Sequence, residues 1–180
     1  MKLRHLTLTL FLTICFSVTI NAQSFQEDII KYLSINGTAQ QYEKAYDEMF
    51  LVLRQQYQNV SIPEEVWTDL QSSKENQVKY IIALLASTYR SYFTKDDIKT
   101  MLAFYESEAG KQLVDDYTKL SPEQNAAFSA FNTSETGQKL EQVRPELAKD
   151  ISETSEFWSR DLFKNTMEAL KEKGYYPIKQ

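Results

Sequence analysis

Glycine and proline are scarce in this chain, and their positions constrain its fold more than any other feature. Only four glycines and four prolines occur among 180 residues. They lie at or near the ends of stretches in which apolar residues recur three and four positions apart. Because both residue types disrupt helices and this spacing is typical of amphipathic helices, we predict an all-α fold. No stretch sustains the alternation with a period of two that indicates strands.

The same residues set the expected helix boundaries. Gly37 and Gly174 supply the left-handed conformation that ends helices. Pro145 should break or kink the helix that begins near Glu135, because proline lacks an amide hydrogen and crowds the preceding turn. No Pro-rich or Gly/Ser-rich linker divides the chain, so we expect a single helical bundle. Helices are predicted near residues 25–35, 39–58, 63–72, 75–93, 95–106, 108–120, 122–132, 135–143 and 145–173.

Four segments have the spacing of a capping box, in which the first and fourth residues cap each other's backbone N–H groups. In one of them Pro122 takes the first helical position, where a missing N–H is harmless. We expect each segment to begin a helix. The four pairs are Thr38 and Gln41, Ser61 and Glu64, Thr94 and Asp97, and Ser121 and Gln124.

The N-terminal segment has the pattern of a secretory signal peptide. Lys2 and Arg4 precede an uncharged, mainly apolar stretch, and Ala22 supplies the small residue that signal peptidase requires. An uncleaved anchor is the alternative, but the stretch is shorter than the about 20 residues that a spanning helix needs. We expect residues 1–22 to be removed. Residues 23–180 would then form one domain, exported by the general secretory route to the periplasm or the medium and not spanning the membrane.

Removal of this segment would also remove the only histidine, His5, and the only cysteine, Cys15. The remaining chain would have no imidazole or thiol for Ser-His-Asp or Cys-His catalysis, for a Cys/His zinc site or for a disulfide. The chain is acidic, with 25 Asp and Glu against 20 Lys and Arg, which argues against a nucleic-acid partner. We expect no cofactor and no metal, and we expect the partner to be an envelope protein or another envelope component.

Two related segments, offset by 27 residues, lie between positions 94 and 147. Each consists of a cap, a short helix, the pattern Phe-x-x-Ser-Glu-x-Gly-x-x-Leu and a second helix. We expect the serine to cap the second helix and the glycine, without a side chain, to let the two helices approach closely. The sequence therefore predicts two similar helical hairpins and a long C-terminal helix. The matching residues are Phe104 and Phe131, Ser107 and Ser134, and Gly110 and Gly137.

The first segment also resembles a known family. The pattern Phe-Tyr-x-Ser-x-x-Gly-Lys over residues 104–111, preceded by Phe-Thr-x-x-Asp over residues 93–97, is similar to the signature of a bacterial exported family, domain of unknown function 2059. Glu108 stands where that family usually has proline, and both residues suit a first helical turn. The similarity covers about residues 89–147. It implies an all-helical periplasmic or secreted protein, and it implies no accepted activity. The candidate interaction or structural residues are Phe104, Tyr105, Ser107, Gly110, Lys111, Phe131, Ser134 and Gly137.

The Ser-Glu-x-Gly corners admit two interpretations. Helix N-termini present unpaired N–H groups, so the two corners could bind phosphate or carboxylate groups. Alternatively, each serine fills the cap and each glycine serves packing, while Glu108 and Glu135 complement the helix dipole. The two glutamates would also repel an anion. We therefore favour the structural interpretation.

Aromatic residues and carboxylates are the remaining candidates. The aromatic stripe that begins at Tyr42 and ends at Tyr57 could line a pocket, although aromatic residues at helical spacing are usually core. In the last helix, Phe157 and Phe163 fall off the apolar line and could form an exposed patch for a partner. Paired carboxylates could hydrolyse glycosides, but here most lie in first turns or on solvated faces. The acidic groups are Glu64-Glu65, Asp96-Asp97, Glu106 with Glu108, and Asp115-Asp116.

Three functions remain open. The leading hypothesis is a non-enzymatic helical module of the bacterial envelope that binds a protein or another envelope component, because reactive side chains are lacking. The second is a carrier that holds a small apolar ligand in a cavity between helices. The third is a hydrolase that depends on carboxylates. The sequence identifies no catalytic residue.

Overall fold

The computed structural model describes residues 24–177, and throughout this range all regular structure is helical. The predicted all-α class is confirmed. The expected signal peptide and its cleavage site lie outside the described residues. After a helix over residues 24–35 come α2 (Thr38–Gln56), α3 (Glu64–Gln71), α4 (Lys74–Tyr92), α5 (Lys95–Glu106), α6 (Glu108–Asp116), the short 3-10 helix η1 (Tyr117–Lys119), α7 (Pro122–Thr133) and α8 (Glu135–Glu172).

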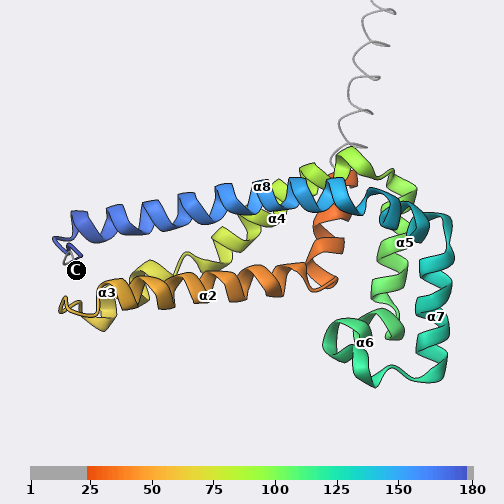
Figure 1. Ribbon diagram of the computed structural model, residues 1–180, viewed down its shortest axis with the longest axis horizontal. Helices are drawn as coiled ribbons and strands as arrows, with labels where there is room; N and C mark the ends of the chain where they lie inside the picture. Colours follow the sequence, from red (N-terminus) through yellow and green to blue (C-terminus); the bar gives the residue numbers. More distant parts are fainter. Residues whose placement is uncertain (1–23, 178–180) are drawn as a thin grey trace, which may run out of the picture.

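The long helices form one part of the molecule and the hairpin helices the other (Figure 1). Helix α4 packs against both α2 and α8. Helices α5, α6 and α7 extend away from one end of this layer, and α7 leads directly into α8 (Figure 1). As a result, the two predicted hairpins, α5–α6 and α7–α8, lie next to each other at this end.

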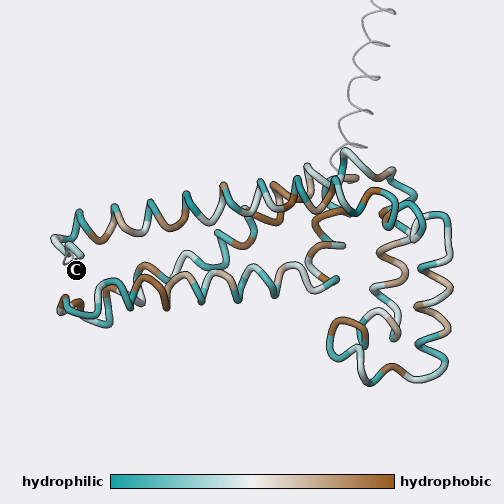
Figure 2. The backbone as a smooth tube through the Cα atoms, in the orientation of Figure 1, coloured by the Kyte–Doolittle hydropathy of each residue, from teal (hydrophilic) through white to brown (hydrophobic). Residues whose placement is uncertain are grey.

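The core runs along the contacts of α4 with its neighbours. Figure 2 shows that apolar residues gather where the helices meet, while the outer faces are mainly hydrophilic. Burial of each large apolar side chain contributes about 1.5–3 kcal/mol, so this contact area is the main source of stability. The side chains with almost no exposed surface are Ile29, Leu33, Tyr46, Phe50, Leu53, Tyr57, Ile81, Leu85, Ile98, Met101 and Leu170.

Helix α8 does not break at Pro145, and the prediction of two separate helices there is wrong. The helix continues from Glu135 to Glu172 with the proline inside it. Proline in a helix interior costs about 3 kcal/mol. Packing on both sides of the proline offsets that cost, because Gly137 is buried before it and Leu147 after it.

Only two of the four expected capping boxes form. Thr94 with Asp97, and Ser121 with Gln124, exchange both hydrogen bonds. Thr38 is instead the first residue of α2, because Gly37 adopts a φ of +91° and the chain turns directly into the helix. Helix α3 begins after Pro63 without a side-chain cap, so the Ser61–Glu64 box is also wrong.

The helix expected over 108–120 ends earlier, at Asp116. The Asp116 side chain accepts a hydrogen bond from the Thr118 N–H at 3.0 Å, and the chain continues as the 3-10 helix η1. A short polar side chain that bonds to the backbone two residues on competes with helix continuation. This local bond explains the early end.

Candidate functional site

The two Ser-Glu-x-Gly corners have matching geometry. Ser107 Oγ accepts a hydrogen bond from the Gly110 N–H at 3.2 Å and donates to the Phe104 carbonyl at 2.6 Å. Ser134 forms the same two bonds with Gly137 at 3.1 Å and with Phe131 at 2.6 Å. Each serine therefore satisfies an N–H group that an anion would otherwise bind. The geometry favours the structural interpretation of the corners.

The corner glycines are required for steric reasons. A Cβ at Gly110 would overlap the carbonyl oxygen of Phe104 and lie 2.5 Å from Tyr105 Cα. A Cβ at Gly137 would overlap the carbonyl oxygen of Phe131 and lie 2.8 Å from Asn132 Cα. Both clashes are with backbone, which cannot rotate away as a side chain can. Only glycine lets the chain fold back this tightly, as predicted.

The motif phenylalanines pack against each other. The rings of Phe104 and Phe131 are stacked, with centroids 4.5 Å apart and an interplanar angle of 11°. Phe128 lies 6.0 Å from Phe104 and extends the contact. The two hairpins are joined through this pair, a contact that the repeat pattern alone does not reveal.

Tyr105 connects the hairpins to the long helices. Its ring makes edge contacts with Phe131 at 6.4 Å and with Tyr32 at 5.5 Å, and Tyr32 lies 5.8 Å from Tyr89 on α4. Burial raises the pKa of Tyr89 to about 12 and also raises the pKa values of Tyr32 and Tyr105. These phenols stay neutral near pH 7. The motif tyrosine is thus part of an aromatic cluster that holds the two parts of the molecule together.

Asp97 links the start of α5 to the start of α8, a contact that the capping pattern alone did not reveal. Its carboxylate caps Thr94 and accepts a bond from Lys139 Nζ at 2.5 Å and one from Thr136 Oγ1 at 3.3 Å. Burial alone would raise the pKa of Asp97. The hydrogen bonds from Lys139 and Thr94 outweigh it and lower the pKa to about 2.

Several of the other acidic residues named above also have structural partners. Glu64 accepts two hydrogen bonds from Arg54, Glu108 pairs with Lys111 at 2.8 Å, and Glu106 pairs with Lys31. The bonds from Arg54 and Lys111 lower the pKa values of Glu64 and Glu108. A general acid near pH 7 requires a raised pKa. These shifts therefore do not favour a carboxylate-based hydrolase.

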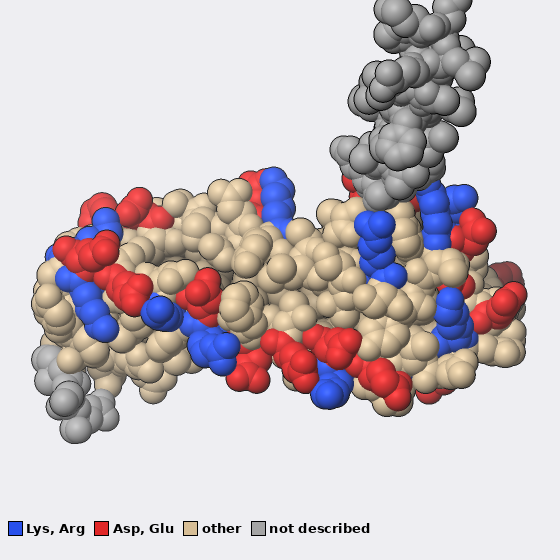
Figure 3. Space-filling model, turned by 90° about the horizontal axis from the view of Figure 1, so that it is seen from above, with Lys and Arg blue, Asp and Glu red and all other residues tan. Residues whose placement is uncertain are grey.

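Charges of both signs are mixed over the surface. On the face seen in Figure 3, Lys and Arg side chains lie among Asp and Glu side chains and form no continuous basic stripe. Among residues 24–177, no three His, Cys, Asp or Glu side chains gather closely enough to hold a metal ion. Within this same range, no helix combines the length and apolar character that crossing a membrane requires.

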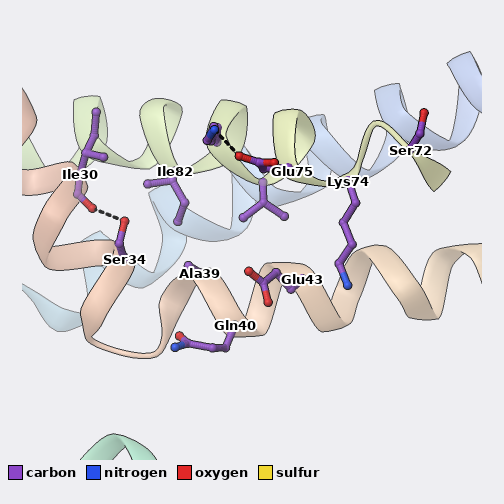
Figure 4. A pocket seen from close by; sticks show the side chains of 11 residues that line it. Ile30, Ser34, Ala39, Gln40, Glu43, Ser72, Lys74, Glu75 and Ile82 are labelled. Carbon is purple, nitrogen blue, oxygen red and sulfur yellow. Dashed lines mark hydrogen bonds and ion pairs between the residues drawn. The ribbon is translucent and has the colours of Figure 1, made fainter. Parts of the chain in front are cut away.

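A groove with an apolar floor lies between the helix over 24–35, α2 and α4 (Figure 4). Its volume is about 820 Å³ and it is open to solvent along one side. The floor consists of aliphatic side chains, and charged or polar side chains form the rim. The floor residues are Ile30, Ala39, Val78 and Ile82, and the rim residues are Ser34, Gln40, Glu43, Ser72, Lys74, Glu75 and Lys79.

Tyr105 and Lys111 of the motif line a second, more polar groove. It lies between residues 35–44 and α6, has a volume of about 720 Å³, and includes three amide side chains, those of Asn36, Gln40 and Gln41. The other motif residues serve packing and capping. None of them lines the apolar groove, which the sequence motifs did not indicate.

The aromatic candidates separate into core and surface. Tyr46, Phe50 and Tyr57 of the α2 stripe are buried, so the stripe is mainly core. Phe157 is 48% exposed, but Phe163 packs against the core. The expected patch of both phenylalanines is therefore reduced to one exposed ring.

The fold and these sites define an all-helical protein with two closely packed hairpins and an apolar surface groove. Residues 80–127 match a family described as an uncharacterized protein conserved in bacteria (DUF2059), which confirms the resemblance predicted from the 104–111 motif. The match covers both α5 and α6 completely. Comparison with curated proteins and with solved structures gives no match.

Proposed function

We propose that this protein is a non-enzymatic, exported helical module of the bacterial envelope that binds a protein partner in the apolar groove. The observation that carries the proposal is the groove itself, in which aliphatic side chains of three helices form a floor beneath a charged rim. Apolar floors with polar rims are the usual anatomy of protein interfaces.

The floor is firmly held, which suits a binding surface. Val78 is 7% and Ile82 is 3% exposed, because both side chains also belong to the main core. The small side chain of Ala39 leaves the groove open on the α2 side. Because this surface is already ordered before a partner binds, little entropy would be lost in ordering the groove.

A carrier of a small apolar ligand is the second candidate, and the volume of the groove favours it. About 820 Å³ lies within the usual range for small-molecule sites, about 300–1,000 Å³. However, such sites usually enclose most of the ligand, whereas this groove is open along one side. A bound apolar molecule would remain partly in water. We therefore place protein binding first.

A photo-cross-linking residue at Gln40, on the rim, tests the proposal in cells. We expect a discrete adduct with an envelope protein that is lost when Ala39→Trp fills the groove. The matched control places the cross-linker at Ala126, an exposed residue on α7. Equal adducts at both positions, or adducts unaffected by Ala39→Trp, would contradict the proposal.

The carrier alternative is tested with N-phenyl-1-naphthylamine, a neutral dye that fluoresces in apolar surroundings. Saturable fluorescence that Ala39→Trp abolishes, without any protein adduct at Gln40, would favour the carrier. Circular dichroism of the variant would verify that the helices are intact.

A further inference from the structure

Glu43 is the rim carboxylate of the apolar groove that is left without a partner. Lys74 pairs with Asp47 at 2.7 Å, and Lys79 pairs with Glu75 at 2.5 Å. In the described part of the chain, no hydrogen bond or ion pair engages the Glu43 side chain. Its carboxylate extends from α2 into the space between α2 and α4, near Ala39 (Figure 4). The groove thus combines an apolar floor with one uncompensated negative charge.

We propose that the groove binds an amphipathic, basic helix of a partner protein. Apolar side chains of that helix enter the groove, and a Lys or Arg beside them pairs with Glu43. This inference rests on the proposed function and adds the chemistry of the partner.

The spacing of the groove residues fits a helix as the occupant. Ala39 and Glu43 are one turn apart on α2, as Val78 and Ile82 are on α4. Apolar side chains at positions i and i+4 of a bound helix have the same repeat and can insert along both walls. The volume of about 820 Å³ accommodates side chains but not a whole helix. The partner helix would therefore lie over the opening and fill the groove with one face.

The charge of the groove favours a partner helix of positive charge. The two rim lysines already have carboxylate partners, so they attract an acidic helix weakly, and Glu43 repels it. A basic helix gains an ion pair with Glu43 at the edge of an apolar surface. The chain as a whole has a formal net charge of −5, which also favours the approach of a basic partner.

Three synthetic peptides of about fourteen residues, or four turns, provide the test. All have the same leucine stripe, and their polar positions are all Lys, all Gln or all Glu. Fluorescence anisotropy with residues 23–180 should give the tightest binding for the Lys peptide and the weakest for the Glu peptide. Glu43→Gln should weaken Lys-peptide binding about 1.5- to five-fold, the range of an exposed ion pair, and leave the Gln peptide unaffected.

Glu48→Gln is the matched control. It removes the same charge from the same helix, but position 48 lies roughly 140° around α2 from position 43 and is exposed. General attraction between an acidic protein and a basic peptide would fall equally in both variants. A larger loss in Glu43→Gln than in Glu48→Gln supports the inference, and equal losses overturn it.

Failure of the inference and failure of the proposed function give different results. If all three peptides bind equally and only Ala39→Trp abolishes binding, the groove is a docking site without preference for a basic helix. If no peptide binds while the Gln40 adduct persists, the occupant is not a helix of this kind. If sedimentation shows a dimer that Ala39→Trp dissociates, the occupant is a second copy of the chain. If the cross-linker at Gln40 gives no adduct and no peptide binds, the proposed function itself is contradicted.

Discussion

At the residue scale, a few small and polar side chains determine the most constrained geometry in the molecule. Ser107 and Ser134 each bond to the last turn of one helix and the first turn of the next, and Gly110 and Gly137 let these two helices meet in close backbone contact. The same residue types would suit an anion site. The hydrogen bonds of Ser107 and Ser134 are instead used within the corners, where they join consecutive helices.

Gly110→Ala should destabilise the protein by about 1–3 kcal/mol, because the new methyl group meets backbone atoms that cannot move aside. Urea unfolding followed by circular dichroism measures this change. Lys111→Ala is the control, since it changes the adjacent exposed residue and removes only an exposed ion pair with Glu108, which contributes little to stability. A Gly110→Ala variant as stable as the control would show that the corner is not sterically tight.

Asp97 makes stability depend on pH. Its folded pKa of about 2 is lower than the unfolded value of about 4. Its contribution, about 2 kcal/mol, is therefore fully present above pH 4 and is lost as the pH falls from about 4 to 2. In Asp97→Asn, the free energy of unfolding should fall at pH 7, and the loss of stability between pH 4 and 2 should become shallower. Unchanged pH dependence would contradict the role given to Lys139.

At the element scale, α8 shows how packing overrides a local signal. Proline removes one helical hydrogen bond, yet α8 is a single helix of 38 residues with Pro145 inside it. Pro145 itself is exposed, while Gly137, two turns before it, and Leu147, two residues after it, are buried. The core contacts of α8 therefore hold both halves in one helix.

Pro145→Ala should stabilise the protein by about 2–3 kcal/mol. The variant recovers a hydrogen bond and relieves crowding, which together are worth about 3 kcal/mol. The greater freedom of alanine in the unfolded chain offsets up to about 1 kcal/mol of this. Thermal unfolding compared with Glu146→Ala, the exposed neighbour, gives the measurement. Destabilisation would mean that the packing of α8 requires a bend at the proline.

At the scale of the whole molecule, aromatic contacts connect parts that are distant in sequence. The Phe104–Phe131 stack joins the hairpins, and Tyr105 and Tyr32 continue the contact to the long helices. Among the long helices, Tyr42 of α2 contacts Trp158 of α8 edge to face at 5.4 Å. Aromatic rings thus account for much of the connection between elements.

A double-mutant cycle tests the stack. Phe104→Leu and Phe131→Leu should each destabilise the protein, and their effects should be non-additive by about 0.5–1.5 kcal/mol, the usual coupling of an aromatic pair. Urea unfolding of both single variants and the double variant provides the cycle. Additive effects would show that the rings pack independently.

The sequence alone was sufficient for the fold class, the resemblance to DUF2059 around the 104–111 motif and most helix boundaries, because these depend on local chemistry. Apolar residues three and four apart, Ser121 followed by Pro122, and the Ser-x-x-Gly corners act through neighbours within one or two turns. The wrong predictions arise for the same reason, because they also rested on local sequence alone. Pro145 is a strong local signal that distant packing outweighs, and Thr38 and Ser61 have the spacing of caps without the backbone geometry.

Which distant surfaces meet depends on how the helices pack, and this is seen only in the three-dimensional structure. It joined Phe104 to Phe131 and Asp97 to Lys139, and it brought Ile30, Ala39 and Val78 together as one groove. No short-range pattern indicates these contacts, because the residues come from separate helices whose relative placement depends on the summed burial of many side chains. The apolar groove is consequently a property of how the helices pack, whereas the corners that hold the hairpins closed are already evident in the order of the residues.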